Sequence, residues 1–200
     1  SKAFSELEAL KIRSRAIPGK MVTETMTPTF VKNLFVNEQS DPGSMLNSDD
    51  GGRRIAERVL IRLGLNKDSA FRYTYSSVGA LGLGQIMPQT YRNIVHDYPE
   101  VKLIKDAGIG RADVLNAIKA SILVLDDHFA AVVNGANQSS QGRKILERKT
   151  DREIEDIRAA IYNGGPGKYQ SLTGNISMAV SETVSFLMKL SLIRELHLFD

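Results

Sequence analysis

The chain has 200 residues, 42% of them hydrophobic and 24% charged, with a formal net charge of +3; this is typical of one globular domain, or of one domain with an elaboration. The absence of cysteine excludes disulfides and cysteine-based metal sites. No dense run of Lys and Arg with interleaved aromatic residues indicates nucleic-acid binding, and no apolar run reaches the roughly 18 residues of a membrane span.

The N-terminal part of the chain is predicted to form two helices. A short helix is expected over residues 6–14, and the Pro-Gly pair at 18–19 ends it. The Thr-Pro pair at 27–28 is typical of a helix N-cap and first turn. Apolar residues between 30 and 35 recur at helical spacing, and the Asp-Pro-Gly sequence at 41–43 stops this second helix.

Glu38 falls in the last turn of the second predicted helix. The negative end of the helix dipole and the neighbouring apolar face both disfavour an ionised carboxylate there. Both effects raise the pKa of the carboxyl, as a general acid requires. A solvated glutamate at a helix end is the alternative interpretation of the same position.

The middle of the chain combines a polar loop, a helix and a glycine-rich run. Residues 44–52 predict a loop and residues 54–65 an amphipathic helix. Residues 79–88 contain three glycines within six positions, and each would cost about 1 kcal/mol in a helix. Such a run predicts backbone that turns sharply or approaches a ligand, with a plain surface loop as the alternative. Residues 73–75 before it are the best strand candidate.

The second half of the chain is predicted to be helical with polar interruptions. Asp113 caps a long helix, residues 134–142 form a loop, and residues 144–156 form a solvated helix or an extended linker. The four consecutive helix breakers after Asn163 are a firm stop. The helices expected here cover residues 90–95, 114–133, 156–162 and 176–199. The sequence therefore predicts a mainly α fold with at most a small β-hairpin.

Three motifs occur in one order along the chain. Residues 76–88 read Ser-x-x-Gly-Ala-x-Gly-Leu-x-Gln-x-Met-Pro, residues 160–167 read Ala-x-Tyr-Asn-Gly-Gly-Pro-Gly, and residues 182–187 read Glu-Thr-x-x-Phe-Leu. Together they resemble the signature of the soluble lytic transglycosylase (SLT) family, relatives of goose-type lysozyme. The resemblance implies a single lysozyme-like domain over residues 1–200, with an insertion at 41–72.

The catalytic glutamate of this family ends a helix, usually as Glu-Ser, which points to Glu38. The sequence departs from the pattern because Gln39 replaces the serine and because the interval to Ser76 is longer than usual. Asp68, within Asp-Ser-Ala-Phe, is a rival at nearly the family spacing. Aspartate is one methylene shorter, which would misplace its carboxyl, and Gly64 interrupts the helix before it. Glu38 is therefore the predicted acid.

The resemblance also implies the remaining site residues. Tyr162 is the second catalytic residue, and its hydroxyl needs a partner, for which a carboxyl is suitable. Glu182 either supports the groove or serves in a helix cap or salt bridge, so no convincing second catalytic carboxyl is identified. The substrate-binding residues implied are Ser76, Gly79, Ala80, Gly82, Gln85, Met87, Asn163 and Glu182.

The implied activity is cleavage of the β-1,4 bond between N-acetylmuramic acid and N-acetylglucosamine in peptidoglycan, leaving 1,6-anhydromuramic ends. Glu38 would act first as acid and then as base, and the acetamido group of the substrate would replace a second carboxyl. Two alternatives stay open. One is a lysozyme-type muramidase, in which water attacks, and the other is a non-catalytic peptidoglycan-binding or assembly module.

The resemblance implies that the protein binds peptidoglycan strands and has an envelope or virion assembly partner. It implies a location in the periplasm, the cell envelope or a virion. No secretion signal is visible in this sequence. The three histidines show no metal-ligand spacing. No metal and no cofactor are therefore expected.

Overall fold

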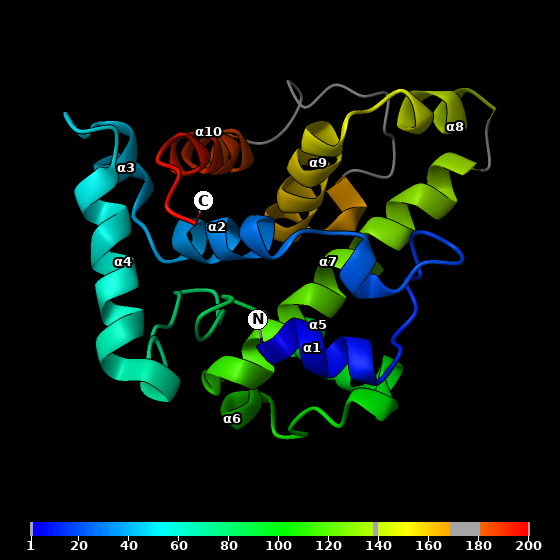
Figure 1. Cartoon of the computed structure of the whole chain (residues 1–200), viewed down its shortest axis with the longest axis horizontal. Coiled ribbons are helices and arrows are strands. Elements are labelled where there is room, and N and C mark those ends of the chain that lie inside the picture. Colours follow the sequence, from blue (N-terminus) through cyan, green and yellow to red (C-terminus); the bar gives the residue numbers. More distant parts are fainter. Residues whose placement is uncertain (1, 138–139, 169–180, 200) are drawn as a thin grey trace.

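The computed structural model describes residues 2–137, 140–168 and 181–199, and these residues are mainly α-helical, as predicted (Figure 1). The helices are α1 (Lys2–Ala9), α2 (Pro28–Glu38), α3 (Pro42–Leu46), α4 (Arg53–Asn66), α5 (Pro88–Asp97), α6 (Ala107–Ala112), α7 (Val114–Asn137), α8 (Ser140–Glu147), α9 (Asp151–Gly164) and α10 (Ser181–Glu195). Short 3-10 turns are η1 (Val22–Glu24), η2 (Lys67–Ser69), η3 (Pro99–Val101) and η4 (Pro166–Lys168). Within these ranges there are isolated β-bridges but no sheet, and Leu81 pairs with both Tyr75 and Ile86.

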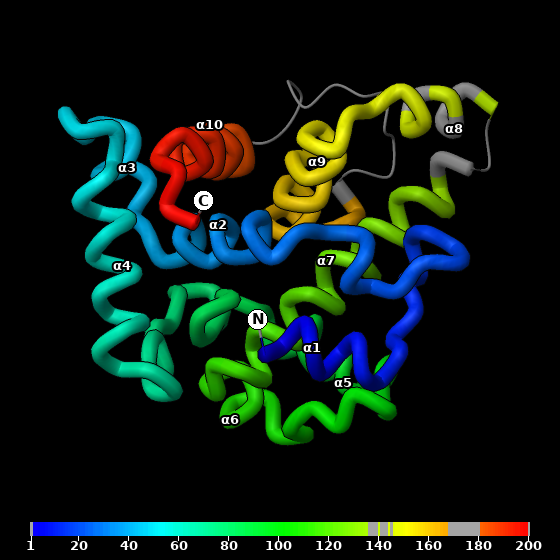
Figure 2. The backbone as a smooth tube through the Cα atoms, in the orientation of Figure 1, coloured from blue at the N-terminus to red at the C-terminus, as the bar shows by residue number. Residues whose placement is uncertain are grey.

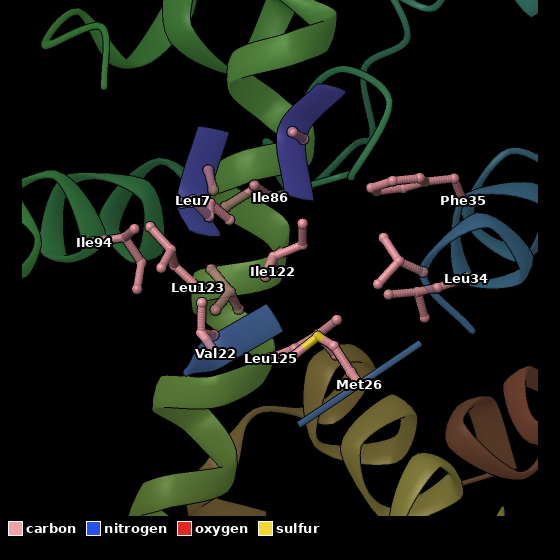
Figure 3. Close-up of a cluster of buried hydrophobic side chains, with 14 of the residues drawn as sticks. Leu7, Val22, Met26, Leu34, Phe35, Ile86, Ile94, Ile122, Leu123 and Leu125 are labelled. Carbon is pink, nitrogen blue, oxygen red and sulfur yellow. The ribbon is translucent and has the colours of Figure 1, made fainter. Parts of the chain in front are cut away.

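Helix α7 is the element against which most of the others pack. Its cap is the predicted one, because the Asp113 carboxylate accepts the N–H of Asn116 at 2.8 Å. Helices α1, α5, α6, α8 and α9 all contact it. Figure 3 shows Ile122 and Leu125 of α7 among buried side chains from α1, α2 and α5. Burial of this apolar surface is the main force that holds these helices together.

Helix α2 forms as the sequence predicts. The Thr27 hydroxyl accepts the N–H of Phe30 at 3.0 Å, and Pro28 occupies the first turn. Leu34 is fully buried in the main core. The helix ends at Glu38, so this carboxylate lies in the last turn, as expected.

The segment predicted as an insertion forms an arm at the edge of the molecule. Helix α4 stands beside α2 in Figure 1, and the tube in Figure 2 returns from its end toward the glycine-rich run below α2. A separate buried cluster joins this arm to α2 and α10, and it consists of Val36, Met45, Ala56, Val59 and Ile193. The loop expected at 44–52 is partly helical, because Asp41 caps α3 and Pro42 begins it. The same residues thus both stop α2 and start α3.

Two predicted boundaries near the chain's polar stretches are wrong. The helix expected at 6–14 is α1, which ends at Ala9 because Lys11 turns into the left-handed region (φ 53°). The loop expected at 134–142 is helical up to Asn137 and again from Ser140. A single Gly such as Gly135 costs only about 1 kcal/mol in a helix, which is too little to end α7.

Helices α9 and α10 complete the fold next to α2. Helix α9 starts earlier than predicted, at Asp151, because Thr150 and Glu153 form a reciprocal capping box. It ends at Gly164, where the predicted breakers begin. Of the final helical stretch expected at 176–199, residues 176–180 lie outside the described residues and α10 supplies most of the rest.

Candidate active site

The C-terminal end of α2 opens into a cavity of about 220 Å³, here called the Glu38 cleft. Helices α5, α7, α9 and α10, the glycine-rich run and the residues just before that run contribute its other walls. Its lining residues are Glu38, Ser76, Val78, Ala80, Gln85, Ile86, Met87, Thr90, Val124, His128, Tyr162, Asn163 and Glu182. The cleft thus gathers residues of all three sequence motifs around the predicted acid.

Most of the predicted site residues lie on this cleft, but two do not. Gly79 and Gly82 are absent from its lining. Both have positive φ angles, 96° and 77°, which favour glycine. A Cβ atom at Gly82 would overlap the carbonyl oxygen of Arg111. Close packing on the protein itself therefore accounts for this glycine, and contact of its backbone with a substrate stays a prediction.

The carboxyl of Glu38 is held in surroundings that favour its neutral form. Burial of the group raises its pKa to about 8, well above the usual 4.5. The Lys189 ammonium opposes this change, and the Glu182 carboxylate adds to it. The residue keeps part of its surface open to the cleft. Glu38 is therefore a carboxyl that carries a proton at neutral pH and faces a hollow.

Glu182 is an exposed residue of α10 that lines the cleft together with Glu38. Across the described chain no salt bridge to it is present. The salt-bridge role considered for Glu182 is thus not observed. Glu182, from the third motif, is thus a second carboxyl on the cleft.

The hydroxyl of Tyr162 has a different partner from the one predicted. It donates to the carbonyl oxygen of Gly84 at 2.6 Å and lies 2.9 Å from the Ser121 hydroxyl. No hydrogen bond joins Tyr162 to Glu38 in the part of the chain that the structure describes. Burial raises the pKa of Tyr162, and the nearby Glu38 carboxyl raises it further. Tyr162 therefore lies near Glu38, but its hydroxyl binds the backbone of the glycine-rich run and not the carboxyl.

Tyr162→Phe should lower the free energy of unfolding by about 1–2 kcal/mol, because the buried Gly84 carbonyl would lose its donor. Urea denaturation measures this difference. Tyr73→Phe is the matched control, since that residue is 87% exposed, and its effect should stay within about 0.5 kcal/mol. Equal effects of the two substitutions would contradict the assigned contact.

Gln39 connects the end of α2 to the glycine-rich run. Its amide donates to the carbonyl oxygens of Gly82 at 3.0 Å and Leu83 at 2.9 Å. A serine, which the resemblance would place here, is too short to span both groups. The departure from the family pattern therefore coincides with a contact that holds the run against the end of α2.

Two other predicted binding residues are partly committed to contacts within the protein. The Gln85 amide donates to Gly82 at 2.8 Å and to Thr74 at 3.2 Å, which leaves its carbonyl oxygen for a ligand. The Asn163 carbonyl oxygen accepts the Thr183 hydroxyl at 3.0 Å, and its NH₂ group makes no hydrogen bond to another described residue. Both side chains can still make one type of hydrogen bond in the cleft.

Sequence reasoning missed His128 and Lys189. His128 lines the cleft from α7, one turn after Val124, and burial lowers its pKa. Its Nδ1 atom is buried and has no hydrogen-bond partner among the described residues. The spacing of Val124 and His128 on one helix face was the only available signal. Lys189, on α10, contacts the backbone on both sides of Glu38.

Asp68, the rejected rival, lies in η2 and is exposed. It is not among the residues that line the Glu38 cleft. Groups of His, Asp and Glu that could hold a metal ion are absent from the described residues. Those residues also include no helix with the length and apolarity needed to cross a bilayer.

Comparison with known proteins identifies no relative of this chain. No family model matches the chain, and neither the curated proteins nor the solved structures contain a match. The functional assignment therefore depends on the motifs and on the cleft.

Proposed function

We propose that this protein is a peptidoglycan lytic transglycosylase with a lysozyme-like fold related to the SLT family. The observation that carries the proposal is the Glu38 cleft. A carboxyl with a pKa of about 8 shares one hollow with Tyr162, Gln85 and Glu182, which come from three separate motifs. Enzymes obtain such pKa values by burial where a carboxyl must act as a general acid near neutral pH.

In the first step, Glu38 gives its proton to the glycosidic oxygen between N-acetylmuramic acid and N-acetylglucosamine. The bond from that oxygen to C1 of the muramic residue breaks, and positive charge develops at C1. The acetamido oxygen of the same sugar stabilises this charge. The NH₂ group of Asn163 and the carbonyl oxygen of Gln85, which make no hydrogen bond within the described residues, would orient the sugar.

In the second step, the Glu38 carboxylate accepts the proton of the muramic C6 hydroxyl. The C6 oxygen then bonds to C1 and closes a 1,6-anhydro ring. Glu38 ends the cycle protonated, so atoms and charge balance without water. One carboxyl can serve both steps because its pKa lies close to the pH of the reaction.

Product analysis tests this proposal. Purified cell walls digested with the protein should release fragments with 1,6-anhydromuramic ends, recognised by mass spectrometry as lighter by one water than fragments with reducing ends. Release of reducing ends alone would reject the transglycosylase mechanism. Binding to walls without any release of fragments would favour a non-catalytic binding or assembly module.

A lysozyme-type hydrolase is the second candidate, and the position of Glu182 favours it. This carboxyl lies on the same cleft as Glu38, and most glycosidases use two carboxyls that flank the scissile bond. In that case Glu182 would activate water or stabilise the charge at C1. Glu182→Gln would then abolish cleavage, whereas a transglycosylase that depends on Glu38 alone would keep a reduced rate.

The rate of wall clearing should stay steady between about pH 5 and 7 and fall as the pH rises above about 8. Glu38 must be protonated to act as an acid, and its pKa of about 8 sets the alkaline limb. Turbidity loss in buffers of equal ionic strength measures the profile. A parallel wall-pelleting assay separates loss of binding from loss of chemistry, and a rate that increases from pH 7 to 9 would contradict the acid role.

A further inference from the structure

Lys189 is a buried lysine without a carboxylate partner at salt-bridge distance in the described chain. It is 3% exposed, and its Nζ atom donates to the carbonyl oxygens of Asn37 and Ser40, each at 2.5 Å. Removing an ammonium group from water is strongly unfavourable unless other groups compensate. Two carbonyl dipoles compensate only in part, so a buried cation at this point requires a further explanation.

The two carbonyl groups that hold Lys189 lie on either side of Glu38 in the sequence. The ammonium therefore sits on the last turn of α2, where the helix dipole is negative and a cation is favourable. Lys189 and Glu38 also influence one another through space. The ammonium lowers the pKa of Glu38, and the carboxylate raises the pKa of Lys189, which burial lowers to about 8.

We propose that Lys189 is a positioning residue for the Glu38 proton: it fixes the end of α2 and stabilises the ionised carboxyl that forms when the proton leaves. This inference rests on the proposed function. Burial alone would hold Glu38 in its neutral form and make it a poor proton donor. When Glu38 protonates the leaving oxygen, the Lys189 ammonium stabilises the new negative charge through space, and no proton moves to or from the lysine.

The other titratable groups around this pair do not provide the same charge. They come from α7, α9, α10 and the cap of α3, and they are His128, Tyr162, Glu182 and Asp41. Burial lowers the pKa of His128 and so favours the neutral imidazole. Glu182 raises the pKa of Glu38, and Asp41 raises that of Lys189. Among these residues, Lys189 is thus the one that supplies a positive charge near Glu38.

The test is an NMR titration of the Glu38 side-chain carboxyl in protein labelled with ¹³C-glutamate. Glu38→Gln identifies the resonance, whose midpoint in the parent should lie at about 8. Lys189→Met removes the positive charge and should move the midpoint upward by about one pH unit or more. Lys189→Arg keeps the charge and should return the midpoint to the parent value.

Lys119→Met is the matched control. Lys119 is also partly buried, but it pairs with Glu6 at 2.9 Å and is not on the cleft. This substitution should leave the Glu38 midpoint unchanged. An unchanged midpoint in a folded Lys189→Met variant would overturn the inference.

The reverse titration serves if Lys189→Met does not fold. Glu38→Gln removes the anion that raises the pKa of Lys189, so the lysine midpoint, read from its labelled Cε, should fall below about 8. No fall would overturn the inference. These titrations do not require the protein to cleave its substrate. If the midpoints shift as expected but the protein does not cut cell walls, only the proposed function is rejected. Unshifted midpoints in a protein that cuts walls reject only the role of Lys189.

Discussion

Glu38→Gln should lower the rate of cell-wall clearing by about 1,000-fold, within the range that general acid–base catalysis typically contributes. The amide has nearly the shape of a protonated carboxyl, but it cannot give up a proton to the leaving oxygen or later accept one. Turbidity loss of purified walls at about pH 6 measures the rate, and chromatography of the released fragments confirms it.

The same substitution should stabilise the fold at neutral pH. The folded protein keeps a proton on Glu38 up to about pH 8, whereas the unfolded chain releases it near 4.5. The stability of the parent therefore falls as the pH rises through this window, and a glutamine does not titrate. In thermal unfolding, the melting temperature of Glu38→Gln should lie above that of the parent at pH 7 and close to it at pH 4. A variant that is inactive and less stable at pH 7 would indicate a folding defect instead.

Asp68→Asn is the activity control for Glu38→Gln. Asp68 is exposed and is not on the cleft, so this variant should clear walls at the parent rate. If Asp68→Asn abolished clearing and Glu38→Gln did not, the acid would be Asp68 and the proposed cleft would be the wrong site.

Gly82→Ala should destabilise the protein by about 3 kcal/mol or more. The left-handed φ of 77° at Gly82 costs an alanine roughly 1–2 kcal/mol. The added Cβ would also overlap the carbonyl oxygen of Arg111, and backbone cannot move aside as a side chain can, so overpacking adds roughly 1–3 kcal/mol. Urea denaturation of the purified variant measures the loss, which is a large part of the stability of an ordinary domain.

Gly19→Ala separates the two causes of this loss. Gly19 has a similar φ of 87°, but a Cβ there would meet nothing within 4 Å. Only the conformational cost of about 1–2 kcal/mol should remain. Equal losses at both positions would mean that the contact with Arg111 has no energetic weight.

Local signals allowed much of the fold to be predicted. The Thr27 cap and the proline after it identified the start of α2, and the breakers after Asn163 identified the end of α9, because each acts on backbone groups within one turn. The same locality placed Glu38 at a helix end. The end of α1 was missed because Lys11 adopts a left-handed conformation that a lysine does not signal.

The surroundings of the predicted acid could not be derived from the sequence. Lys189 contacts the backbone of Ser40 from 149 positions away, and a lysine in a mixed helix gives no sign of burial. The partner of Tyr162 is a backbone carbonyl, a group that every residue carries. Gly82 was predicted to face a ligand because a glycine forced by internal packing has the same sequence signal.

The docking of α10 on α2 also controls the protonation of Glu38. Helix α10 carries both Lys189 and Glu182, and it packs directly on α2. If α10 detached while the rest stayed folded, water would reach the end of α2 and the Glu38 carboxyl would ionise at neutral pH like any exposed acid. A partial opening of this kind needs less free energy than complete unfolding. The capacity to donate a proton would therefore vanish reversibly, before the architecture itself is lost.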